Sequence, residues 1–343
     1  MIKVNCWNEY DKLKTVILGN VYDIDRVPSM YDGQDQESFQ KIVEQTHEEL
    51  REFRLILEQH GATVLQPTQP QNYNQAISGN IKRQSPLINM RDFHMAYGEM
   101  FFMTHGSYRS RRFQHAWIED IVNQMIDDDN LVVCANEPNF QENPSWSAAG
   151  KEEAWFNAYE REYADKNLFH VASILRHDKT AFVSEHPGSP IGRKWMERWL
   201  SQQGITMQTA PSYVGHIDGS NSILNANTIM TMHPDAEVWQ AFDNRIYCPV
   251  LPERHSWRFD PALVKEVQNP TNWLYEWQGH FQDFSAEANA FSIDPETVCL
   301  SFYDRDFYAT LKDHGVTAIY VQWRNRGFWG GGLHCITCDI ERG

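Results

Sequence analysis

Three segments of the chain share one local plan, in which a helical pattern is followed by a glycine and then a short strand. They are Glu49–Leu65, Gly192–Thr209 and Arg305–Gln322. A helical period that gives way to a short β-like run predicts an α/β unit, and three copies favour a repeated module. A glycine after a helix is also a common way to end any helix. The pattern alone therefore does not decide between a closed ring of modules and a doubly wound sheet.

Short β-like runs recur along the whole chain. The expected strands are Thr15–Leu18, Thr63–Leu65, Glu99–Met103, Leu131–Cys134, Thr180–Val183, Thr206–Thr209, Ser222–Leu224, Thr228–Met232, Val298–Ser301 and Ala318–Gln322. Helices are expected over Ser38–His60, with Ser38 as N-cap, and over Gly192–Gln203 and Asp304–His314. The stretches Gln66–Gln75 and Asn136–Asn143 are expected to be loops. No linker rich in Pro, Gly or Ser divides the sequence, which predicts a single domain over residues 1–343.

Charge and cysteine usage narrow the class of protein. The formal net charge is −16, which argues against nucleic acid or an anionic membrane surface as partner, because phosphate binding needs a cationic footprint. The N-terminus lacks an apolar signal core and no apolar run has the length of a membrane span, which predicts a cytoplasmic protein. The six cysteines are scattered and form no small disulfide framework, which indicates reduced thiols.

The C-terminal tail carries the clearest candidate nucleophile. Gly330–Gly332 remove every Cβ shortly before Cys335, so the backbone can take positive φ values and a ligand can approach closely. A thiol placed there is suited to chemistry, although two buried thiols after a Gly-rich turn are the simpler reading. Cys335 and Cys338 form one C-x-x-C, and no second cluster has ligand spacing, so no metal is expected.

Of the fourteen histidines, His216 has the most informative context, because glycines stand close on both sides of His216-Ile217-Asp218. If this piece is extended, His216 and Asp218 share one face and could pair a general base with a cation-binding carboxylate. The alternative is a polar structural turn. Asp92, which follows Arg91 ahead of a strand-like run, is either a strand anchor or a carboxylate that faces a cavity.

Four stretches resemble one family. The opening "VNCWNEYDKLKTVILGN", the segment "MRDFHMAYGEMFF", the segment "GHIDGSNSIL" and the tail "GGGLHCITCDIERG" are similar to amidinotransferases, including the arginine:glycine and arginine:inosamine-phosphate enzymes. The resemblance runs in the same order from residue 4 to the end. It implies an α/β fold, namely a five-bladed α/β propeller of pseudo-symmetric ββαβ modules around a central active site.

The resemblance also implies site residues. The family's nucleophile falls on Cys335, its general acid/base on His216, and its guanidinium-holding aspartates on Asp92 and Asp218. It implies an amidino-cysteine intermediate, a small-molecule guanidino donor (arginine or a related compound) and a primary amine as acceptor, with no cofactor and no metal. Because adjacent residues on an extended chain point to opposite faces, His334 is not expected to be the base.

Two departures from the family leave alternatives open. The stretch that carries a histidine-orienting carboxylate in the family reads Phe169-His170-Val171-Ala172-Ser173 here, so His170 would take that place. A neutral imidazole cannot stabilise an imidazolium as a carboxylate does. The arginine that clamps the donor's α-carboxylate in the family is absent near Ala236. A guanidine hydrolase of the arginine deiminase or dihydrolase type, or a ligand-binding relative without turnover, therefore remains an alternative, and a homodimer is left open.

Overall fold

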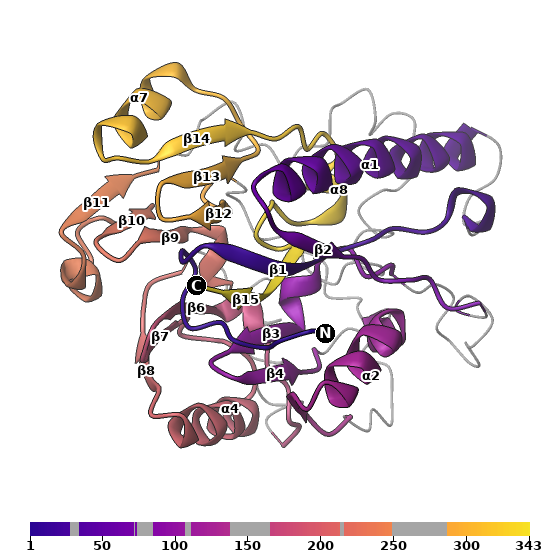
Figure 1. The fold of residues 1–343 in the computed structure, drawn as a ribbon, viewed down its shortest axis with the longest axis horizontal. Coiled ribbons are helices and arrows are strands. Elements are labelled where there is room, and N and C mark those ends of the chain that lie inside the picture. The colour runs from indigo at the N-terminus through magenta and orange to yellow at the C-terminus, as the bar shows by residue number, and fades with distance from the viewer. Residues whose placement is uncertain are drawn as a thin grey trace, which may run out of the picture.

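The computed structural model describes residues 1–27, 34–71, 73, 85–106, 111–137, 165–212, 216–248 and 287–343. Within these residues it forms five three-stranded sheets. The sheets stand around a common centre, and helices α1, α2, α4 and α7 lie toward the periphery (Figure 1). Both chain ends lie near the middle of this view. No helix among the described residues is long and apolar enough to cross a bilayer.

The elements have the following bounds. The strands are β1 (Leu13–Leu18), β2 (Thr63–Leu65), β3 (His94–Tyr97), β4 (Met100–Met103), β5 (Leu131–Cys134), β6 (Ile174–His177), β7 (Thr180–Val183), β8 (Thr206–Thr209), β9 (Asn221–Asn225), β10 (Thr228–Thr231), β11 (Asn244–Tyr247), β12 (Phe291–Asp294), β13 (Thr297–Leu300), β14 (Thr317–Tyr320) and β15 (Thr337–Arg342). The α-helices are α1 (Gln34–Gln59), α2 (Glu119–Asp127), α4 (Pro190–Gln202), α7 (Arg305–Asp313) and α8 (Arg326–Trp329). The 3-10 helices are η1 (Ile24–Arg26), η2 (Met90–Asp92), η4 (Gln114–Ile118), η5 (Val171–Ser173), η6 (Ile217–Gly219) and η7 (Glu237–Ala241).

Every sheet repeats one plan. A middle strand pairs antiparallel with an inner strand and parallel with an outer strand, and the middle-to-outer connection carries a helix. Strands β3, β4 and β5, with α2, illustrate the plan, because parallel neighbours need such a crossover. The inner strands β15, β3, β6, β9 and β12 lie around the centre in Figure 1. This arrangement is the five-bladed α/β propeller that the family resemblance predicted.

The two ends of the chain close the ring. In the first sheet the order is β15-β1-β2, so the inner strand comes from the C-terminus and pairs antiparallel with β1 near the N-terminus. In the other four sheets the inner strand directly precedes its middle strand. A doubly wound sheet, which the repeat pattern had left open, is therefore excluded for the described residues.

The predicted helix–glycine–strand units are confirmed as α1–β2, α4–β8 and α7–β14. Gly61, Gly204 and Gly315 follow these helices with φ of +90°, +71° and +78°, a region that favours glycine. The prediction of Ser38 as N-cap is wrong, because α1 begins at Gln34 and contains that residue. The ten predicted strands are confirmed with shifts at their ends, whereas the sequence reading missed β3, β6, β11, β12 and β15. Most of the predicted loop Asn136–Asn143 lies outside the described residues.

The centre of the ring is charged. Arg176 on β6 is fully buried and bonds both carboxylate oxygens of Glu9 (2.8 and 2.5 Å) and both of Asp339 (2.7 and 2.8 Å). Arg91 and Arg342 also contact Asp339. Burial alone would raise the pKa of Asp339, but the guanidinium groups of Arg176, Arg91 and Arg342 hold it well below its usual value. This buried ion network joins the inner strands β6 and β15 and lies beneath the residues considered next.

Candidate active site

Site residues gather where the five inner strands begin. Asp92, Ala172, Gly219, Asn289 and Cys335 each stand two residues before the first residue of an inner strand. The 3-10 helices η2, η5 and η6, which lead into β3, β6 and β9, contact one another in the order η2–η5–η6, and β15 contacts η2. The pseudo-symmetric ring therefore places equivalent positions of different modules at the starting ends of the inner strands.

Cys335 is buried in a turn just before β15. Its Sγ lies 3.1 Å from Asn289 Nδ2 and 3.4 Å from Asp218 Oδ2. The Cys335 backbone N–H donates to Asn289 Oδ1 at 3.0 Å, and the Cys335 carbonyl accepts from the Arg91 N–H at 2.9 Å. The thiol is thus fixed between an amide and a carboxylate. Cys338 is also buried, with Sγ 3.4 Å from the His94 carbonyl.

Asp218 is fully buried, and its two oxygens differ. Oδ2 lies 2.8 Å from His334 Nδ1 as well as 3.4 Å from the Cys335 sulfur. Oδ1 has no hydrogen-bond partner among the described residues. A buried carboxylate oxygen without a donor is costly, so it indicates a place for a donor that the described residues do not supply.

His334 contradicts the expectation that it faces away from Cys335. Residues 333–336 form a turn and not an extended strand, so His334 and Cys335 both contact Asp218 Oδ2. His334 Nε2 lies 3.1 Å from Glu9 Oε2. Both ring nitrogens thus face carboxylates, and the imidazole links Asp218 to the buried ion network.

Asp92 is buried against a guanidinium from within the chain. Arg111 forms an ion pair with Asp92 Oδ2, donates to the Asn89 carbonyl at 3.2 Å, and stacks over the Phe93 ring at 4.5 Å. Burial alone would raise the pKa of Asp92, but Arg111 and the nearby His216 and His170 hold it below its usual value. The carboxylate of Asp92 is therefore kept ionised by an ion-pair partner from within the chain.

His216 and His170 form a pair. His216 Nε2 lies 3.0 Å from His170 Nδ1, and His216 Nδ1 lies 3.8 Å from Asp92 Oδ1. The His216 side chain is 19% exposed, so it is the most accessible of these groups. Of the two conformations considered for His216–Asp218, the extended one is not present, because Ile217 and Asp218 belong to the 3-10 helix η6, which His216 precedes. Residues 213–215 lie outside the described part. His170, which the family resemblance gave as a possible histidine-orienting residue, is thus in contact with His216.

The predicted residues fall into two adjoining groups. One contains Cys335 and Asp218, and the other contains Asp92, His216 and His170. Two links join the groups. His216 and Asp218 are two residues apart, on either side of Ile217 at the start of η6. The backbone N–H of Arg91 in η2, which ends at Asp92, donates to the Cys335 carbonyl. The sequence reading missed the contacts made by Glu9, Asn89, Arg111 and Asn289, and it had excluded His334. For Asn289 the signal would have been its place two residues before the strand β12, but the sequence reading missed that strand.

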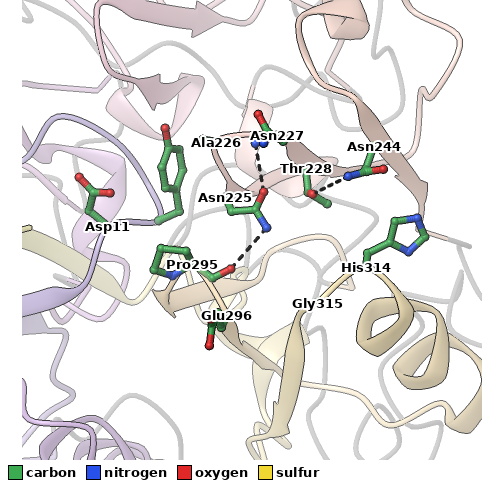
Figure 2. Close-up of a pocket in the computed structure, with 11 residues that line it drawn as sticks. Asp11, Asn225, Ala226, Asn227, Thr228, Asn244, Pro295, Glu296, His314 and Gly315 are labelled. Carbon is green, nitrogen blue, oxygen red and sulfur yellow. Dashed lines mark hydrogen bonds between the residues drawn. The ribbon is translucent and has the colours of Figure 1, made fainter.

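Other features of the described residues do not compete with this site. No cluster of three or more His, Cys, Asp or Glu side chains among them could hold a metal ion. An open cavity of about 470 Å³ lies at the opposite end of β9 from Asp218, between the β9–β10 and β12–β13 turns and the end of α7 (Figure 2). Asn225 and Asn244, which line this cavity, bond to the Pro295 carbonyl and Thr228 Oγ1. The cavity contains none of the predicted site residues.

Known proteins resemble the chain along its whole length, although no family model matches it. It is 21% identical to an inosamine-phosphate amidinotransferase of Streptomyces griseus, with 100% of this chain and 98% of that protein covered. It is 20% identical to the mitochondrial glycine amidinotransferase of Xenopus laevis, with 98% and 82% covered.

Solved structures show the same fold. An inosamine-phosphate amidinotransferase from Streptomyces griseus superposes with a TM-score of 0.72 at 18% identity, over 99% of this chain and 97% of that one. A dimethylarginine dimethylaminohydrolase superposes with a TM-score of 0.58 at 14% identity, over 95% and 99%. The chain is therefore similar to amidinotransferases in sequence, and it shares a fold with them and with this hydrolase.

Proposed function

We propose that this chain, whose homologues are amidinotransferases, moves an amidino group from a guanidino donor to a primary amine through a covalent intermediate on Cys335. Arginine or a related compound would be the donor. The observation that carries the proposal is the Asp218 carboxylate, which is fully buried, has one oxygen without a partner among the described residues, and has the other 3.4 Å from the Cys335 sulfur. A cation that donates hydrogen bonds is the ligand such a group requires.

A second acceptor supports a guanidinium as that cation. Asn89 Oδ1 is buried without a partner among the described residues, while its Nδ2 donates to the Trp329 carbonyl at 2.7 Å. A Cβ placed on Gly331 would lie 2.6 Å from Asn89 Oδ1 and 2.8 Å from Cys335 Cβ, so Gly331 packs against both and this acceptor lies close to Cys335. A planar guanidinium presents several N–H donors in one plane and suits acceptors on two sides.

Donor binding would change the charge around the sulfur. In the free chain the Asp218 carboxyl group lies 3.4 Å from the Cys335 sulfur. A guanidinium bound to Asp218 brings a positive charge to the sulfur, so the thiol loses its proton more easily, and His216 takes this proton. The thiolate then attacks the central carbon of the guanidinium, and a new S–C bond forms as a tetrahedral intermediate.

His216 is the proposed proton carrier. As the C–N bond of the donor breaks, His216 gives a proton to the departing amine, which leaves an amidino group on Cys335. His216 then takes a proton from the incoming amine, whose nitrogen attacks the amidino carbon and releases the thiolate. His170, 3.0 Å from His216, would orient the ring. Asp92 would contact the donor through Oδ1, since its Oδ2 is paired with Arg111.

Hydrolysis is a second candidate, because a dimethylarginine dimethylaminohydrolase has the same fold. Water in place of the amine would release the amidino group from Cys335 as part of a urea-type product. The two reactions differ in the acceptor alone, so the described residues favour neither by their chemistry. The resemblance in sequence to amidinotransferases favours transfer.

A donor and acceptor screen tests the proposal. Arginine and other guanidino compounds are incubated with the protein, with and without glycine, lysine or a diamine, and ornithine, urea, citrulline and ammonia are followed. Transfer predicts that the donor is consumed only when an amine is present and that a new guanidino product accumulates. Donor consumption without an amine would assign hydrolysis. Donor binding with no consumption under either condition would leave a ligand-binding protein and reject the proposed function.

Gly332→Ala is expected to reduce transfer by about 100-fold, because a small misplacement of reacting groups costs about that much. A Cβ on Gly332 would lie 2.7 Å from both Cβ and Oδ1 of Asn289, so it would displace the side chain that holds Cys335. The measurement is kcat/KM with the best donor and amine. Gly61→Ala is the control, because Gly61 has a φ of +90° but no atom within 4 Å of an added Cβ. Wild-type kcat/KM in Gly332→Ala would contradict this account of the tail.

A further inference from the structure

The side-chain amide of Asn289 forms hydrogen bonds to His334, Cys335 and Asp218 through both its oxygen and its nitrogen. Its Oδ1 accepts from the backbone N–H groups of His334 (2.9 Å) and Cys335 (3.0 Å). Its Nδ2 donates to the Asp218 carbonyl at 3.1 Å and to the Cys335 sulfur at 3.1 Å. An asparagine amide has two donor hydrogens and two acceptor lone pairs, so all of its capacity is used here.

These contacts fix which end of the amide faces the sulfur. With the oxygen and nitrogen exchanged, the NH₂ group would face two backbone N–H donors, and the oxygen would face the Asp218 carbonyl. Both arrangements are repulsive, so only one orientation satisfies the network. An N–H of Asn289 therefore points at the Cys335 sulfur. Asn289 is 2% exposed, so water does not compete for this contact.

We propose that Asn289 is the positioning residue of Cys335, whose amide N–H stabilises the thiolate and aims the sulfur at the bound guanidinium carbon. This inference rests on the proposed function and adds a residue to it. A hydrogen bond to a charged acceptor is stronger than one to a neutral acceptor, so the contact favours the thiolate over the thiol. The other described group in contact with the sulfur is Asp218, with Oδ2 at 3.4 Å.

Other charged groups surround this part of the site. They are Asp218 and His216 beside η6, Arg91 and Asp92 in η2, His334 next to the nucleophile, and Glu9 behind His334. Of the two groups described in contact with the sulfur, Asn289 is the neutral one and Asp218 the ionisable one. Substitution of Asn289 therefore changes the donor to sulfur while every titratable neighbour is kept.

The test measures the thiolate of Cys335 directly. A small neutral alkylating agent such as iodoacetamide is added to the full chain at a series of pH values, and modification of Cys335 is followed by peptide mass spectrometry. The exposed Cys134 in the same digest serves as internal reference. Below the pKa of the thiol, Asn289→Ala is expected to slow alkylation of Cys335 about tenfold relative to Cys134, the effect of losing one hydrogen bond to a charged group.

Asn289→Asp separates this role from simple packing. Aspartate keeps the shape and the acceptor for the two backbone N–H groups, but it places a carboxylate oxygen where the N–H donor was. The proposal predicts that alkylation slows in the order wild type, Asn289→Ala, Asn289→Asp. A structural role predicts the reverse order for the two variants, because aspartate is the closer fit.

Unchanged alkylation of Cys335 in Asn289→Ala would overturn the inference, and this comparison decides the matter alone if Asn289→Asp does not fold. Circular dichroism and thermal unfolding establish which variants are folded. Alkylation needs no turnover, so the outcome is independent of the donor and acceptor screen. If the protein fails the screen, the proposed function is rejected. If Asn289→Ala still slows alkylation of Cys335 in that case, the contact of Asn289 with the thiolate is retained.

Discussion

Replacement of Cys335 by alanine is expected to lower the rate of amidino transfer by at least about 10³-fold, because loss of a covalent nucleophile removes the reaction path and leaves only binding and polarisation. Donor binding should survive, since Asp218 Oδ1 and Asn89 Oδ1 would remain. The measurement is a single-turnover rate with the donor and amine found in the screen, together with donor affinity by calorimetry.

Cys338→Ala is the matched control for this experiment. Cys338 is equally buried in the same tail, but its sulfur contacts the His94 carbonyl and none of the site residues described above. It should lose stability through a small cavity while its kcat stays within a few-fold of wild type. Comparable losses of turnover in both variants would mean that the tail acts through packing, and the role proposed for Cys335 would fail.

Arg176→Met is expected to lower the free energy of unfolding by about 3–5 kcal/mol, the range for breaking a buried charge network by removing one partner. Arg176 is fully buried and bonds Glu9, Asp339 and the Ala96 carbonyl on β3. Methionine fills part of the volume but leaves the carboxylates with fewer donors. The measurement is the denaturant midpoint and slope at neutral pH, with circular dichroism and Trp fluorescence as separate probes.

Arg54→Met provides the comparison on the surface. Arg54 pairs with Glu58 one turn away on α1, and its side chain is 43% exposed. Exposed pairs of this type contribute little, so the change should stay within about 0.5 kcal/mol. If Arg176→Met cost no more than Arg54→Met, the charged centre would not be what holds the inner strands together.

The sequence predicted most of the outer and middle strands of the propeller, with β11 as the exception, but of the inner strands it predicted β9 alone. Strands β5, β7 and β8 read as apolar or β-branched runs, and three glycines mark the ends of long helices. The inner strands instead supply polar side chains to the charged centre. Arg176 interrupts β6, and Asp339 and Arg342 interrupt β15, so the apolar alternation that identifies a half-buried strand is broken.

The site shows the same division. Cys335, His216, Asp92, Asp218 and His170 could be named because short motifs carry the resemblance to amidinotransferases. Their partners come from distant positions. Glu9 and His334 are in contact although 325 residues separate them in the sequence. Asn289 and Cys335 precede inner strands of two different sheets and are also in contact. No local pattern encodes such contacts, because they depend on how the ring closes.

Trapping the intermediate tests the central claim most directly. The protein is mixed with an isotopically labelled guanidino donor, quenched in acid within one turnover, digested, and the peptide that contains Cys335 is weighed. Our account predicts a mass increase equal to one amidino group on Cys335, which disappears when an acceptor amine is added before the quench. Turnover of the same donor with an unmodified Cys335, or with the label on another residue, would contradict it.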